Sequence, residues 1–337
     1  MPRINKKITS EELITDFIDY CSYKNLAIKT IKSYNQTLLL FAKYLEEEKN
    51  ITDVRKVGKE IVEGYLSFTK ERGKYSFTSS IDALNKNHMD KRSDIGREIS
   101  NTTLNNYLRN IKVFFNWLEE NRIIKNNTVK ECKFVKVVRS AKDQLTDAEY
   151  TRLVKSMDCT KYHEFRDYTI TNLLFDTGMR LSETLSLTID DVDFDRRTIY
   201  LKADRTKGKK DRIVFYSNEM SKLLRRWIRN KDIICETELL FPTRGTVGKL
   251  SPTNFERNFK EYLKRSRIDK NVTPHALRNN FARRFLISSR DIYTLSRILG
   301  HSSVTVTEKA YLDFVDEDLR NSYKNYSPLE NMKRGGK

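Results

Sequence analysis

The chain has 337 residues, which is enough for two domains and too many for one ordinary core. It carries 64 Lys and Arg against 46 Asp and Glu, a formal net charge of +18, with an isoelectric point near 9.6. Hydrophobic residues (38%) and aromatic residues (11%) can still build packed cores, which excludes wholesale disorder. No apolar run is long enough to span a membrane, and the N-terminus lacks the apolar stretch of a secretory signal.

The four cysteines lie far apart and show no paired spacing (Cys21, Cys132, Cys159 and Cys235). A disulfide scaffold or zinc ribbon is therefore not expected, and a reducing prokaryotic cytoplasm is the expected compartment. With only 11 Gly and 5 Pro, the composition also argues against a β-rich chain. We expect a soluble, basic, mainly α-helical protein.

The excess of positive charge is spread over the whole chain. Residues 1–140 carry 26 Lys and Arg against 18 Asp and Glu, and residues 141–337 carry 38 against 28. Two basic regions suggest two surfaces that face one polyanion, and nucleic acid is the obvious partner. A membrane surface is a weaker alternative, because no basic amphipathic helix with aromatic anchors stands apart from the core pattern.

The first region is predicted to be a small helical bundle. Apolar residues recur at helical spacing through residues 11–48, which favours two helices, and again through residues 59–72 and 104–118. Between about residues 73 and 100 the chain turns polar and loses this periodicity, so we expect an insertion or long loop there. Residues 1–132 are therefore predicted to form an all-helical DNA-binding domain.

A basic linker and a second domain are predicted to follow. Residues 133–145 are rich in Lys and Arg and hold no helical stripe, and a capping box from Thr146 to Glu149 marks the start of a helix. The second domain is expected to comprise residues 146–337. It is predicted to be mostly helical with a small antiparallel sheet: helices at 148–157 and 164–177, strands at 192–194, 198–202 and 212–215, then helices almost to the end.

Two segments of the second domain concentrate polar residues. In the stretch from Thr177 to Glu183, Gly178 is suited to end one helix and Arg180 to start the next, with Glu183 one turn further on. Taken alone, this pattern is more typical of an ordinary turn with a solvated ion pair. Lys207 lies at the tip of the hairpin expected between the second and third strands, where its side chain can reach a phosphate. Lysines at turns are usually just exposed to solvent, so this signal is weak by itself.

A third segment places a histidine and an arginine at the start of a helix. Thr273 is suited to cap that helix and Pro274 to occupy its first turn. His275 and Arg278 would then be three residues apart on one face, at a helix end that favours a phosphate. A surface helix start explains this segment equally well when it is taken alone.

The fourth segment is Gly300-His301, ten residues before Tyr311. Gly300 is suited to the position just after a helix, and Thr305 with Glu308 suggests a capping box that begins the helix carrying Tyr311. The chain has only four His but 17 Tyr, so the tyrosine by itself is uninformative and its simplest interpretation is core packing.

Taken together and in this order, the residues resemble the catalytic domain of the tyrosine recombinases, the phage-integrase family. The resemblance covers roughly residues 146–325, and the helical bundle before it is similar in pattern and position to the family's SAM-like core-binding domain. The resemblance implies two arginines that hold the scissile phosphate, a general-acid lysine, two pocket histidines, a nucleophilic tyrosine and a supporting acidic residue: Arg180 and Arg278, Lys207, His275 and His301, Tyr311, and Glu183.

A protein of this family would cut and rejoin double-stranded DNA through a covalent 3′-phosphotyrosine, as a homotetramer on paired sites. No acidic cluster with metal-ligand spacing and no GxxxxGK[ST] loop accompanies these residues, so no metal, ATP or other cofactor is implied. The segment after Tyr311 is expected to dock on a neighbouring protomer through its apolar residues Leu312, Phe314, Val315 and Leu319.

One spacing differs from the family pattern. Many members place the tyrosine nine residues after the Gly-His histidine, and here it is ten residues after His301. The next tyrosine, Tyr323, lies well past the motif in a polar tail. Two other functions share parts of the pattern: a non-catalytic DNA-binding regulator of the same fold and a type IB topoisomerase. The full set of pocket residues argues against the regulator, because a binder needs no aligned nucleophile.

Overall fold

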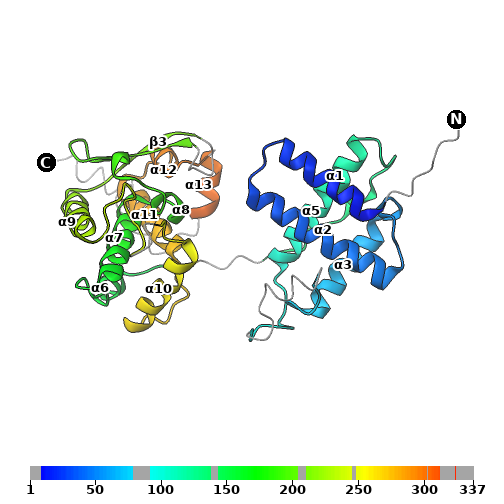
Figure 1. The fold of residues 1–337 in the computed structure, drawn as a ribbon, viewed down its shortest axis with the longest axis horizontal. Helices are drawn as coiled ribbons and strands as arrows, with labels where there is room; N and C mark the ends of the chain where they lie inside the picture. Colours follow the sequence, from blue (N-terminus) through cyan, green and yellow to red (C-terminus); the bar gives the residue numbers. More distant parts are fainter. Residues whose placement is uncertain are drawn as a thin grey trace. The chain divides into compact units, whose positions relative to one another are not determined.

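Figure 1 shows the computed structural model of the chain, in which the described residues are 9–78, 92–137, 143–203, 210–244, 248–301, 303–311 and Tyr323. Within residues 303–311, the side chains of Val306, Lys309, Ala310 and Tyr311 lie outside this description. The chain divides into two compact units, residues 1–139 and 140–337. The described part of the first unit is helical and the second adds a small sheet, so the predicted mainly helical fold class is confirmed.

The N-terminal unit is a helical bundle around an aromatic core. Phe17 in its first helix contacts the rings of Phe114 and Trp117, which lie on the last long helix of the unit. Burying these aromatic rings on the apolar faces of the helices is the main force that holds such a bundle together. The elements, in chain order, are α1 (Ser10–Tyr23), α2 (Ile28–Lys49), the 3₁₀ helix η1 (Val54–Lys56), α3 (Lys59–Arg72), α5 (Asn101–Glu120) and the 3₁₀ helix η3 (Thr128–Glu131).

Two irregular segments of this unit are held by specific hydrogen bonds. Asn105 of α5 pairs with the backbone of Val135 in both directions, each at 2.8 Å, so the first part of the predicted linker lies along α5. In the predicted polar insertion, the N–H of Lys74 donates to the carbonyl of Arg97 at 2.9 Å. The middle of that insertion, residues 79–91, lies outside the described residues.

The C-terminal unit is built around α7, which packs against α9 and α11. Trp227 of α9 is fully buried against Phe165 of α7 and donates its indole N–H to the carbonyl of Leu240 at 2.7 Å. Within the described part of the chain, no helix is both long and apolar enough to cross a membrane. The helices are α6 (Asp147–Lys155), α7 (Tyr162–Thr177), α8 (Leu181–Thr184), the 3₁₀ helix η4 (Ile189–Asp191), α9 (Asn218–Ile234), α10 (Pro252–Arg265), α11 (Pro274–Ser289), α12 (Ile292–Leu299) and α13 (Val304–Tyr311).

Among the described residues, the sheet has three antiparallel strands in the order β1 (Val192–Asp193), β2 (Thr198–Leu201) and β3 (Arg212–Phe215), close to the predicted ranges. Ile199 pairs with Val214, and both are fully buried on the inner face. Because side chains alternate along a strand, Arg212 shares the inner face with Val214, while Ile213 and Phe215 point outward and are exposed. The sheet therefore carries a charged residue into the interior of the unit.

One predicted helix start is wrong. The helix that carries Tyr311 begins at Val304, so Thr305 lies within its first turn and does not cap it. The other capping box predicted in this unit is present: Thr146 accepts from the N–H of Glu149, whose carboxylate accepts from the N–H of Thr146. The predicted box would start the helix at residue 306, so the difference is two residues, which is within the usual uncertainty of helix ends.

Candidate active site

The first predicted arginine, Arg180, lies between the end of α7 and the start of α8. Gly178 ends α7 in the left-handed conformation with φ 66°, and Arg180 then starts the short helix α8. The main-chain N–H of Arg180 donates to Glu183 Oε2 at 2.9 Å, and its Nη1 donates to Oε1 at 2.9 Å. The Glu183 side chain is only 1% exposed, so this ion pair is not the solvated surface pair that the segment alone would favour.

A second guanidinium reaches the same carboxylate. Arg212 of β3 donates to Glu183 Oε1 at 3.0 Å and to Oε2 at 2.6 Å. Burial alone would raise the pKa of Glu183, but the hydrogen bond and charge of Arg212, supported by Arg180, hold that pKa below its usual value. Two guanidiniums therefore share one ionised carboxylate, and the cluster keeps an excess of positive charge. Sequence reasoning did not single out Arg212; the only signal was a charged residue at an inward-facing strand position.

The second predicted arginine, Arg278, lies in the second turn of α11 and is only 2% exposed. Its Nη1 donates to the carbonyl of Gly178 at 2.6 Å, and its Nη2 donates to the carbonyl of Leu299 at 2.7 Å. One guanidinium thus joins the C-terminal ends of α7 and α12. A Cβ at Gly178 would lie 2.4 Å from Cδ1 of Phe281, so both its positive φ and the close packing of α7 on α11 require glycine.

His301 follows α12 directly after Gly300, as predicted. Its Nε2 lies 3.0 Å from Nη2 of Arg278, and its Nδ1 lies 2.7 Å from Oγ1 of Thr307 on α13. Burial lowers the pKa of His301 to about 4, and the positive charges of neighbouring arginines, Arg278 first, act in the same direction. The imidazole is therefore neutral at neutral pH.

The structure describes the remaining predicted site residues only in part. His275 is exposed one turn before the buried Arg278, and its charge contributes to lowering the pKa of His301. Tyr311 is the last residue of α13, and its side chain is not among those described. Lys207 lies outside the described residues.

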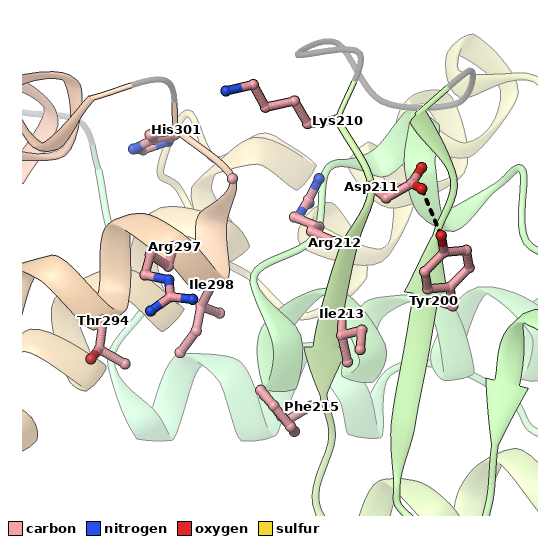
Figure 2. A pocket seen from close by; sticks show the side chains of 11 residues that line it. Tyr200, Lys210, Asp211, Arg212, Ile213, Phe215, Thr294, Arg297, Ile298 and His301 are labelled. Atoms are coloured by element: carbon pink, nitrogen blue, oxygen red, sulfur yellow. Dashed lines mark hydrogen bonds between the residues drawn. The ribbon is translucent and has the colours of Figure 1, made fainter.

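A pocket of about 820 Å³ opens between β3 and α12 beside this cluster. Figure 2 shows Ile213 and Phe215 of β3 on one side of the pocket and Ile298 of α12 on the other. Arg212 and His301 lie toward one end of it (Figure 2). The pocket thus has apolar side chains between strand and helix, with Arg297 beside Ile298, and two side chains of the cluster, Arg212 and His301, toward one end.

This arrangement is suited to an anion with several oxygen atoms. Guanidiniums present planar forks of donors that match phosphate oxygens, and Arg180 retains a side chain that is 23% exposed. Arg180 also contributes to lowering the pKa of His301, which places both residues in one electrostatic environment with Arg278. The fold and the site together define a basic protein with a helical bundle and a second compact unit that carries a cluster of arginines.

Comparison with known proteins identifies the family. Residues 143–317 match the phage integrase family over more than half of the chain, so the protein belongs to that family. It is 26% identical to a tyrosine recombinase of Thermosipho africanus over 315 residues, covering 93% of this chain and 99% of the relative. It is 23% identical to tyrosine recombinase XerD of Listeria monocytogenes over 323 residues, covering 94% of this chain and 99% of the relative.

Two solved structures share the fold over most of the chain. The Tn1549 transposon integrase in complex with transposon right end DNA matches with a TM-score of 0.71 at 18% identity, covering 95% of this chain and 100% of that chain. The XerH recombinase bound to a palindromic difH substrate matches with a TM-score of 0.67 at 19% identity, covering 97% of this chain and 86% of that chain. At this identity, the likeness shows the fold.

Proposed function

We propose that the protein is a site-specific DNA recombinase that cuts and rejoins double-stranded DNA through a covalent 3′-phosphotyrosine. The observation that carries this proposal is the convergence of Arg180, Arg278 and His301, which come from three separate segments, beside the helix that ends at Tyr311. Family membership and full-length relatives named tyrosine recombinases support the same function.

The arginines would act on the scissile phosphate. In-line displacement at a phosphodiester increases the negative charge on its equatorial oxygens, and preorganised cationic donors stabilise that charge. Arg180 and Arg278 take this role in the proposal. Glu183 supports it, because its carboxylate orients the Arg180 side chain and is itself held ionised by Arg212.

The proton transfers are assigned to residues around this centre. Tyr311 oxygen attacks phosphorus, and the bond from phosphorus to the 5′ oxygen breaks. Because the pKa of free tyrosine is about 10, the attack needs a proton acceptor, and His275 has that role. Lys207 donates a proton to the leaving 5′ oxygen. Since the phosphotyrosine conserves the bond energy, attack by a 5′ hydroxyl rejoins the strand, and the proposed steps use no metal or nucleotide cofactor.

The proposed partner is a pair of DNA recombination sites. The Tn1549 integrase and XerH structures are complexes with DNA. As the family resemblance implies, this protein would act as a homotetramer on paired sites. Its C-terminal segment, including Leu312 and Phe314, would dock on a neighbouring protomer; that segment lies outside the described residues. We place the protein in a prokaryotic cytoplasm, associated with the nucleoid when bound to DNA, and as part of a mobile genetic element.

The test is capture of the covalent intermediate. Wild-type protein incubated with nicked duplexes from the flanks of its own gene should form a protein–DNA adduct that survives denaturation, and peptide mapping should place the nucleotide on Tyr311. Tyr311→Phe deletes only the attacking oxygen, so the adduct should disappear while DNA binding persists. Tyr323→Phe is the matched control, since Tyr323 is 67% exposed and should not affect the adduct.

The same assay separates the other functions. A non-catalytic regulator would bind DNA without any adduct from the wild-type protein. A type IB topoisomerase would relax supercoiled plasmid without exchanging strands between two sites, whereas a recombinase joins the flanks of two cleaved sites. Adduct on Tyr323, or adduct retained by Tyr311→Phe, would overturn the assignment of the nucleophile.

A further inference from the structure

Both ring nitrogens of His301 are engaged, and the partner of one determines the role of the other. Arg278 is a guanidinium with donors only, so at 3.0 Å the Nε2 of His301 must accept. The neutral imidazole therefore carries its proton on Nδ1. That Nδ1–H donates to Oγ1 of Thr307 at 2.7 Å. The tautomer follows from the chemistry of Arg278.

Thr307 is fully buried, with 0% of its surface exposed, and it lies on α13 four residues before Tyr311. Residues four apart in an α-helix lie on the same face, one turn from each other. The hydroxyl of Thr307 is thus a polar link between the helix that ends at Tyr311 and the loop that carries His301. Because α12 and α13 also pack against each other, this bond has a defined geometry.

We propose that Thr307 is a positioning residue, whose hydroxyl holds His301 in the Nδ1–H tautomer and couples its ring to the helix that ends at Tyr311. The role in the reaction rests on the proposed recombinase function. The tautomer itself is a property of the free protein.

The Nδ1–H tautomer determines whether Nε2 can donate a hydrogen bond in the pocket. Nε2 is the nitrogen that faces Arg278, so in the free protein it accepts a hydrogen bond from that guanidinium. To donate to a phosphate oxygen, Nε2 must first gain a proton. Thr307 accepts from Nδ1–H in both the neutral and the protonated ring, so the bond to Thr307 is kept when Nε2 gains a proton.

A purely space-filling role for Thr307 predicts a different outcome for two substitutions. Thr307→Val keeps the branched shape but deletes the hydroxyl, which leaves Nδ1 facing a methyl group. Thr307→Ser keeps the hydroxyl and removes the methyl group. If packing alone mattered, Val would behave as wild type and Ser would be the damaged variant; if the hydrogen bond matters, the order is reversed.

The first measurement is the tautomer. The chain has four histidines, so ¹⁵N-histidine labelling gives a simple spectrum of the whole protein, and His301→Gln identifies the signals of His301. Wild type and Thr307→Ser should show the Nδ1–H form at neutral pH. Thr307→Val should show a mixture or the Nε2–H form. An unchanged Nδ1–H signal in folded Thr307→Val would overturn the proposal.

The second measurement is the cleavage rate on nicked DNA at saturating concentration. Thr307→Val should slow adduct formation by about 10-fold or more, as loss of an orienting partner does elsewhere, with unchanged DNA affinity and with rescue by Thr307→Ser. A normal rate in a Val variant with an altered tautomer would remove Thr307 from the reaction. Absence of adduct from wild type would instead contradict the recombinase function, and the tautomer measurement would still decide the role of the hydroxyl.

Discussion

Two buried charge clusters in the C-terminal unit differ in how their charges are matched. In the first, the α7 cluster, Arg166 donates to Asp167 Oδ1 from Nε at 3.0 Å and from Nη2 at 2.9 Å. The other oxygen of Asp167 accepts from Asn258 at 2.8 Å and from Tyr262 at 2.9 Å. One carboxylate therefore meets one guanidinium and two neutral donors, and both ionic side chains are at most 4% exposed.

In the second, the Glu183 cluster, two guanidiniums bind one carboxylate. Arg180 and Arg212 both donate to Glu183, and Arg180 remains 23% exposed. The α7 cluster is closed and matched in charge, which is what a structural element needs. The Glu183 cluster is cationic and reaches the surface, which is what an anion site needs. Burial alone thus does not distinguish a structural ion pair from a functional one, whereas charge balance and access do.

The largest expected effect is on stability, from breaking the α7 cluster. Asp167→Ala leaves Arg166 buried without its carboxylate, so the free energy of unfolding should fall by about 3–5 kcal/mol. Urea denaturation measures this loss. Asp195→Ala, which removes an exposed carboxylate in the turn between β1 and β2, is the control and should change stability little. Equal stability of the two variants would contradict the structural role of the α7 cluster.

A smaller effect is expected from a substitution in the Glu183 cluster, which should lower the rate of adduct formation. Arg212→Ala leaves Glu183 and Arg180 less well oriented, so adduct formation should slow by about 10²-fold while DNA affinity changes little, because affinity comes from many phosphate contacts. Single-turnover cleavage and a binding titration measure the two quantities.

Two control experiments test whether Arg212 affects the rate of adduct formation through Glu183 and Arg180. Arg196→Ala removes an arginine that is 84% exposed in the turn between β1 and β2, and it should leave the rate unchanged. Adding Glu183→Gln to Arg212→Ala should cost less than the sum of the two single changes, since both act on the orientation of Arg180. Full additivity, or a loss of affinity equal to the loss of rate, would show that Arg212 acts elsewhere.

The smallest effect is a pH dependence of stability. The pKa of His301 is lowered from 6.5 to about 4 in the folded protein, so the unfolded chain takes up a proton first as the pH falls. The stability associated with the neutral ring is complete above about pH 6.5 and is lost progressively toward pH 4. In urea denaturation at pH 7.5 and pH 5, wild type should therefore lose more stability than His301→Gln. The same loss in both proteins would contradict the lowered pKa.

Local patterns in the sequence were enough for most elements of the fold. Apolar periodicity predicted α2 and α5, and two short segments on either side of a hairpin turn predicted β2 and β3, because these signals depend on neighbours that are close along the chain. The position of Gly178 after a helix followed from its conformational freedom in the same way. The order and spacing of the motifs also predicted Arg180, Arg278 and His301 as site residues, through the family resemblance.

Tertiary structure alone decided which partners these residues have. Glu183 and Arg212 are 29 positions apart, and Asp167 and Tyr262 are 95 apart, so no helical or strand spacing relates them. The proposed role of Thr307 depends on the hydrogen bond from Arg278 to Nε2 of His301, which leaves the proton on the Nδ1 that faces Thr307. Hydrogen bonds and charge interactions act over a few ångströms in space regardless of chain separation, and only the packing of α7, α11, α12 and β3 brings these groups within that range.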